Sequence, residues 1–144
     1  MNKVRIPSRR RRKKIADSFL EAFASRENFL LIGHKNPDED CISSMVALGL
    51  LITKFNLKPS IVFNRENWEK FPYLLNICKY NSISIIGDPE EIGDSYDTVV
   101  ACDTPKPEMI DFHEALTPVM AADGVRVLEI DHHLEADGQY IGDE

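Results

Sequence analysis

Apolar residues along this chain follow two alternating spacings, which predict a repeating order of strands and helices. Short apolar runs predict five strands, at residues 29–33, 60–63, 82–86, 98–102 and 125–130. Apolar residues at helical spacing predict helices between them, clearly at residues 14–25 and 40–55 and more weakly at 66–77 and 108–120. Strands that are apolar throughout are typical of a parallel sheet covered on both faces. We therefore predict an α/β fold, a doubly wound parallel sheet of about five strands with helices on both faces.

Three of the predicted strands are followed directly by acidic residues or histidines. The first is followed by His34, Asp38 and Asp40, the fourth by Asp103, and the fifth by Asp131, His132 and His133. Each residue alone has an ordinary structural explanation, such as a helix cap or a turn. The carboxyl ends of parallel strands, however, meet at one edge of a sheet, where ligands bind in open α/β folds. The sequence therefore predicts a functional site at this edge.

The residue types in these three segments are suited to divalent metal ions. Carboxylates and imidazoles together bind Mn²⁺, Fe²⁺, Co²⁺ or Zn²⁺, and the excess of carboxylates favours Mn²⁺ or Mg²⁺. Seven side chains are more than one ion needs, and two ions about 3.5–4 Å apart can share a bridging carboxylate and a bridging water. The bridging water becomes a hydroxide near neutral pH and attacks phosphorus. We therefore expect hydrolysis of phosphate esters or phosphoanhydrides.

Three motifs resemble those of a known family, the DHH phosphoesterases. The run GHKNPDEDCISS (residues 33–44) resembles the first motif, ACDTP (residues 101–105) the second and EIDHH (residues 129–133) the third. The chain departs from the common pattern at Glu39 and Ser43, where the family often has glycine. Both residues lie in a predicted tight turn, so they affect the expected loop geometry rather than the ligands.

The resemblance implies a role for each residue at the strand ends. His34 and Asp38 would hold one Mn²⁺, Asp40 and His132 the other, and Asp103 would bridge them; Mg²⁺ or Co²⁺ could replace Mn²⁺. His133 would face the substrate phosphate or the attacking water. Asp131 would orient the imidazoles. The catalytic residues implied are thus His133 and Asp131.

The resemblance also implies a range of substrates. The family includes RecJ-type single-strand exonucleases, oligoribonucleotide and phosphoadenosine phosphate (pAp) phosphatases, cyclic dinucleotide phosphodiesterases and type II inorganic pyrophosphatases. We expect a hydrolase acting on phosphodiester or phosphomonoester bonds of nucleotides or short single-stranded oligonucleotides. Two alternatives stay open: an inorganic pyrophosphatase-like domain, and a non-catalytic module that binds a nucleotide or metal. Turnover would distinguish an enzyme from a binding module.

Members of the family carry more than these three motifs. A fourth motif with another metal-binding Asp and a DHH-associated domain that binds substrate would be expected downstream, and nothing after His133 matches either. We therefore expect a basic arm at residues 1–14 and an incomplete DHH domain at residues 15–144. Such a piece would bind metal weakly and hydrolyse phosphodiesters poorly or not at all.

The net charge of −7 conceals an uneven distribution. Residues 1–14 hold eight basic residues and no acid, whereas the other 130 hold nine basic and 24 acidic residues, a net of −15. The arm is compatible with nucleic-acid contact and equally with a solvated segment that keeps the protein soluble. Three widely spaced cysteines fit reduced thiols of a cytoplasmic protein. No apolar run approaches the length of a membrane span, so no membrane contact is expected; the oligomeric state stays open.

Overall fold

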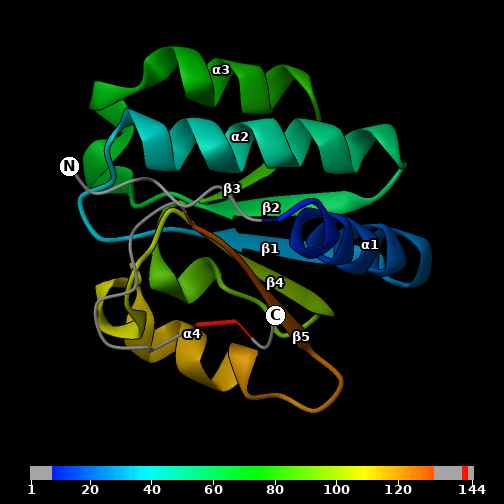
Figure 1. Ribbon diagram of the computed structural model, residues 1–144. Helices are drawn as coiled ribbons and strands as arrows, with labels where there is room; N and C mark the ends of the chain where they lie inside the picture. Colours follow the sequence, from blue (N-terminus) through cyan, green and yellow to red (C-terminus); the bar gives the residue numbers. More distant parts are fainter. Residues whose placement is uncertain (1–7, 132–140, 143–144) are drawn as a thin grey trace, which may run out of the picture.

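A five-stranded parallel sheet forms the centre of the computed structural model, which describes residues 8–131 and 141–142 (Figure 1). The strands are β1 (Asn28–Ile32), β2 (Lys58–Val62), β3 (Ser84–Ile86), β4 (Thr98–Cys102) and β5 (Arg126–Ile130). The α-helices are α1 (Arg9–Ser25), α2 (Glu39–Lys54), α3 (Pro72–Tyr80) and α4 (His113–Met120), and short 3₁₀ helices cover Arg65–Lys70, Pro89–Glu91 and Pro107–Met109. The predicted doubly wound α/β fold is confirmed.

Each face of the sheet carries its own hydrophobic cluster. Successive side chains of a strand point to opposite faces, so Phe29 and Leu31 of β1 join one cluster while Leu30 and Ile32 join the other. Figure 1 shows α2 and α3 over the first face and α4 over the second. Because both faces are covered, all four of these β1 side chains are fully buried, which explains why the strand is apolar throughout.

The strand order is β3-β2-β1-β4-β5, with every neighbouring pair parallel. The chain runs outward from β1 to β2 and β3, and then crosses back to place β4 on the other side of β1. The connections that leave β1 and β4 therefore diverge at their carboxyl ends. Such a topological switch point opens a crevice in which doubly wound folds bind their ligands.

Two predicted helices are each divided into shorter pieces, so their prediction as single helices was wrong. In residues 66–77, Pro72 disfavours helical backbone at Phe71, which takes φ −134° and ψ 52°, and α3 begins only at the proline. In residues 108–120, Ile110 leaves the helical path and forms an antiparallel bridge with His34. Phe112 then adopts a left-handed conformation (φ 55°) before α4 begins.

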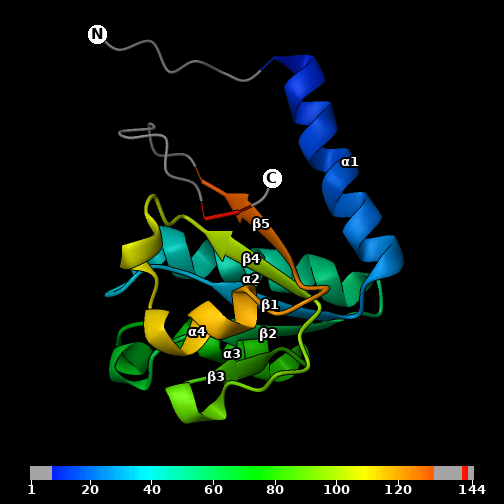
Figure 2. The same cartoon turned by 90° about the horizontal axis from the view of Figure 1, so that it is seen from below.

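Helix α1 begins at Arg9, five residues before the predicted start. Ser8 caps it, since its side-chain oxygen accepts a hydrogen bond from the Arg11 amide at 3.3 Å. The run of basic residues has no apolar periodicity, so the pattern carried no helical signal there, although Arg and Lys are good helix formers. Figure 2 shows this first half of α1 standing away from the sheet. None of the helices among residues 8–131 is long and apolar enough to cross a membrane.

Candidate metal centre

His34 follows β1 directly and lies at the switch point. Its Nδ1 lies 2.8 Å from the carbonyl oxygen of Lys35. Because a carbonyl only accepts hydrogen bonds, Nδ1 donates in this contact, and in the neutral imidazole the lone pair is then on Nε2. Nε2 lies 3.9 Å from Oδ1 of Asp38. The contact with the backbone thus favours the neutral tautomer in which Nε2, the nitrogen available to a metal ion, is the one near a carboxylate.

Asp38 caps helix α2 and also lies near His34. It is the N-cap of α2, where its Oδ1 accepts a hydrogen bond from the Cys41 amide at 2.9 Å. Its side chain is 66% exposed, whereas that of His34 is 14% exposed. The Asp38 carboxylate therefore faces solvent, whereas the His34 ring is largely buried.

Asp103 follows β4, on the other side of the switch point. Its amide continues the ladder to β5 by donating to the Ile130 carbonyl at 2.8 Å. Its backbone is left-handed (φ 51°), a conformation that Asp tolerates better than most residues, and the residue is buried. The turn directs the chain back over β1, where Ile110 pairs with His34. The backbone geometry of this buried turn thus sets the position of Asp103.

One group of three potential metal ligands lies within the described residues. Ligand atoms of His34, Cys41 and Asp103 all lie within 4.8 Å of one another. The pKa of the Cys41 thiol is raised to about 12, chiefly by burial and to a smaller extent by the nearby carboxylates of Asp103 and Asp38, while a backbone hydrogen bond from His34 opposes the rise. A neutral thiol is a weak ligand, so the imidazole and the carboxylates are the better candidates for binding a metal. The sequence had given Cys41 no role, although its spacing of three residues from Asp38 places it on the same side of α2.

The remaining predicted site residues are less closely grouped. Asp40 lies exposed in the first turn of α2, and its side chain does not belong to the group of three. Asp131 follows β5 directly, at the same edge of the sheet. His132 and His133 lie outside the described residues. The metal-binding roles predicted for Asp40 and His132 and the catalytic roles predicted for Asp131 and His133 remain predictions, as do the metal-binding roles of His34, Asp38 and Asp103.

The loop that follows Asp103 closes over the end of β1, which sequence reasoning missed. The Lys35 amide donates to the Met109 carbonyl at 2.7 Å, and the Asp111 amide donates to the Gly33 carbonyl at 2.9 Å. Burial raises the pKa of the Asp111 carboxyl, an effect opposed by hydrogen bonds from Asn64 and from the Phe112 amide. The ends of β1, β2 and β4 are thereby tied together, and His34 is fixed between two paired segments.

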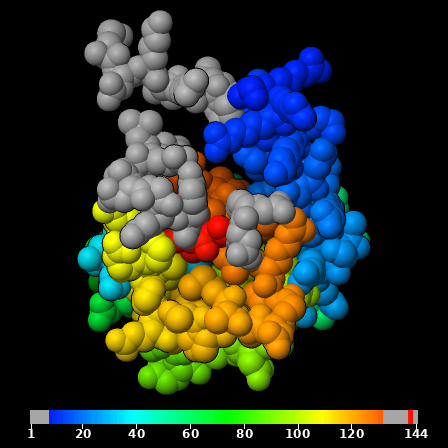
Figure 3. Space-filling view, turned by 60° about the horizontal axis from the view of Figure 1, so that its bottom comes forward, coloured from blue at the N-terminus to red at the C-terminus, as the bar shows by residue number. Residues whose placement is uncertain are grey.

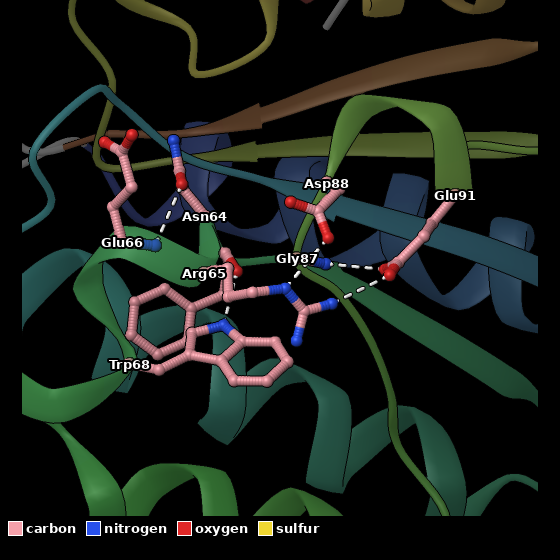
Figure 4. A network of polar contacts seen from close by, with 8 residues as sticks. Asn64, Arg65, Glu66, Trp68, Gly87, Asp88 and Glu91 are labelled. Carbon is pink, nitrogen blue, oxygen red and sulfur yellow. Dashed lines mark hydrogen bonds and ion pairs between the residues drawn. The ribbon is translucent and has the colours of Figure 1, made fainter.

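A second polar network lies at the carboxyl ends of β2 and β3 (Figure 4). The Arg65 guanidinium lies 4.2 Å from the centroid of the Trp68 ring and binds Asp88 at 2.8 Å and Glu91 at 2.9 Å. The Trp68 indole donates to the Phe63 carbonyl at 2.7 Å. Trp68 packs against the core. The charged groups of this network pair with one another, so the network stabilises the rim of the sheet.

The fold and the geometry at the switch point agree with the comparison to known families. Residues 28–143 match the family described as "DHH family, N-terminal domain". The chain belongs to the DHH family. The matched range includes all three motifs, from the loop that follows β1 to the segment that follows β5. No curated protein sequence matches this one.

A solved structure has the same fold as this DHH domain. It is the crystal structure of an exopolyphosphatase-related protein from Bacteroides fragilis, with a TM-score of 0.61 and 19% sequence identity. The match covers 88% of this chain and 36% of that one. This chain therefore spans little more than a third of the length of its structural neighbour. At this identity the likeness concerns the fold alone.

Proposed function

We propose that this DHH domain belongs to a metal-dependent phosphoesterase that hydrolyses phosphodiester or phosphomonoester bonds of nucleotides or short oligonucleotides. One observation carries the proposal: ligand atoms of His34, which follows β1, and Asp103, which follows β4, lie within 4.8 Å of each other at the switch point, and Asp38 Oδ1 lies 3.9 Å from His34 Nε2. This donor set fits a divalent cation. Membership of the DHH family supports phosphoester chemistry.

The residues of the chain would divide the work as follows. His34, Asp38 and Asp103 would hold one ion, with Asp103 shared with a second ion at Asp40 and His132. Asp131 would orient the neighbouring imidazoles, and His133 would contact the substrate phosphate or the attacking water. Two divalent ions, Mn²⁺ first and Mg²⁺ or Co²⁺ as substitutes, would supply Lewis-acid polarisation of the phosphate and activation of water.

The charge of the domain supports a need for cations. Carboxylates of Asp38, Asp40, Asp103 and Asp131 lie at one edge of an acidic body, and together they repel a phosphate group. Bound divalent cations would reverse the sign of the potential where the substrate must lie. Three free, buried cysteines support a reducing compartment such as the cytoplasm.

Cleavage of a phosphoanhydride is the second candidate. The solved structure with the same fold is described as exopolyphosphatase-related, and the pyrophosphatase-like alternative belongs to the same chemical class. The attacked atom is phosphorus in both cases, so the metal ligands would be the same. The two candidates differ in the leaving group, so a comparison of substrates distinguishes them.

Metal binding and turnover are measured separately to test the proposal. Isothermal titration of the 144-residue chain with Mn²⁺ should give saturable binding that Asp103→Asn weakens. Loss of a direct ligand should cost more than the roughly 10- to 100-fold that loss of an outer partner costs. Asp123→Asn, at an exposed position in the turn before β5, is the charge-matched control and should bind as the unmodified chain does.

Product release from a short oligoribonucleotide, a nucleotide monoester and pyrophosphate is then followed with and without Mn²⁺. We expect slow Mn²⁺-dependent release from the first two, abolished by Asp103→Asn. Cleavage of pyrophosphate alone would support the second candidate. Metal-dependent nucleotide binding without any turnover agrees both with a binding module and with an incomplete catalytic domain, whereas equal Mn²⁺ binding by the Asp103→Asn variant would refute the proposed centre.

A further inference from the structure

The first half of α1 is a helix that touches little of the rest of the protein. Residues 9–17 are all exposed. The second half is anchored: Ala22 and Phe23 are buried, and the Phe23 ring lies 5.7 Å from that of Phe29 and 5.0 Å from that of Phe55. Figure 3 shows the exposed half as the blue projection at one side of the molecule. At 1.5 Å per residue it extends about 14 Å from its anchor.

Six consecutive basic residues occupy this projection, Arg9, Arg10, Arg11, Arg12, Lys13 and Lys14. Of these six residues, only Lys13 forms an ion pair with another described residue, Asp17, at 2.8 Å. The first turn of α1 has no acidic residue, although the positive end of the helix dipole lies there. Like charges four residues apart also repel, as at Arg9 and Lys13. The helix therefore places cations where they repel each other and the dipole.

We propose that the projecting half of α1 (residues 9–17, the basic rod) is a docking element for the sugar–phosphate backbone of a single-stranded nucleic acid. An anionic strand would relieve both unfavourable terms by neutralising the cations at the positive end of the helix. The rest of the chain has a net charge of −12, and this element holds the densest run of positive charge in the sequence. The binding does not depend on hydrolysis at the metal centre.

The distribution of charge favours a flexible strand over a rigid surface. Six successive residues at 100° each carry charge around the whole circumference of the rod. A single strand can curve around such a rod, whereas the acidic body would repel most of a duplex. A membrane-bound helix needs a broad apolar side with aromatic or leucine residues. Residues 9–14 contain no apolar side chain, and Ile15 is the only large one among residues 9–17.

The number of unpaired cations sets the expected salt dependence. Arg9, Arg10, Arg11, Arg12 and Lys14 can each neutralise one phosphate, so the logarithm of the association constant should fall with that of the salt concentration with a slope of about −3.5 for a single strand. A fourfold increase in salt should therefore weaken binding by about a hundredfold.

The test measures fluorescence anisotropy of a labelled single-stranded oligonucleotide with the full chain, without divalent metal, at several salt concentrations. The test variant replaces Arg9, Arg10, Arg11 and Arg12 by Gln, which preserves helix propensity. The control variant removes four exposed cations of the body by Lys54→Gln, Lys58→Gln, Lys70→Gln and Lys79→Gln. Hydrogen exchange of residues 9–17 is followed with and without the oligonucleotide.

We expect the steep salt slope, at least a tenfold loss of affinity in the arginine variant, an unchanged control variant and slower exchange in the rod upon binding. The proposal is overturned if the arginine variant binds as well as the unmodified chain, or if the control loses as much affinity. Tighter binding to an equally charged duplex, to inorganic polyphosphate or to anionic lipid vesicles would overturn it as well. Because no turnover is measured, failure here leaves the proposed hydrolysis intact, and failure of hydrolysis leaves this binding intact.

Discussion

Gly33 is closely packed beside the candidate metal centre, and its replacement by alanine tests this packing directly. A Cβ atom at Gly33 would lie 2.5 Å from Cys41 Sγ, 3.1 Å from Met45 Cε and 3.4 Å from Met45 Sδ. Both neighbours are buried and belong to the core. The sulfur of Cys41 thus occupies the space that a side chain at position 33 would need.

Two opposing effects set the change in unfolding free energy that we expect for Gly33→Ala. Overpacking of a closely packed core costs about 1–3 kcal/mol of unfolding free energy. Alanine also restricts the unfolded chain, which raises the unfolding free energy by about 0.4–1 kcal/mol. We expect Gly33→Ala to lower the unfolding free energy by about 1–2 kcal/mol. Cys41→Ala alone should cost about 1 kcal/mol, because it leaves a cavity close to the size of one methyl group.

The double variant separates packing from other causes. With Sγ removed, the nearest atom to the new Cβ is the flexible end of Met45, so Gly33→Ala should cost less than about 1 kcal/mol in a Cys41→Ala background. Urea unfolding of all four proteins closes the cycle. We expect a favourable coupling of about 1 kcal/mol between the two substitutions. Additive effects would show that the clash is not what destabilises the single variant, and the reasoning would be refuted.

Three further predictions concern other positions. Asp38→Ala should lower stability by about 1 kcal/mol through loss of the α2 cap and should also weaken Mn²⁺ binding, whereas Asp38→Asn should weaken binding alone; equal urea midpoints for the two variants would contradict this. Burial raises the pKa of Cys41 to about 12 and that of Cys78 to about 11, so these thiols ionise only in the unfolded chain as the pH rises above about 8.5. Stability should therefore fall above that pH, less so in a Cys41→Ala/Cys78→Ala variant, and a disulfide-exchange reagent at pH 7.5 should react rapidly only after denaturation. Asp97→Ala should cost about 1–3 kcal/mol, because the carboxylate accepts hydrogen bonds from two backbone amides at the start of β1, at 2.8 and 3.0 Å; a melting temperature equal to that of Asp123→Asn would contradict it.

Much of the fold could be predicted because its signals are local. The apolar run of β4 predicted its bounds, Thr98–Cys102, without error. The helix predicted for residues 40–55 agrees with α2 within one residue at each end. The division of residues 66–77 had a local signal too, since Pro72 lies within that range. The second division had no such signal, because Ile110 leaves the helix to pair with His34, 76 positions earlier in the chain.

The sequence by itself determined which chemistry the strand ends carry. Apolar runs form the strands, and the sequence alone shows that a histidine and aspartates follow them. The lateral order of the strands is decided by hydrogen bonds between distant segments, and no local pattern encodes them. Only the tertiary structure placed β4 beside β1, and so brought Asp103 to His34 at the switch point. It also brought Cys41 into that group and extended α1 through the basic segment, since burial and the projection of a helix depend on what packs around it.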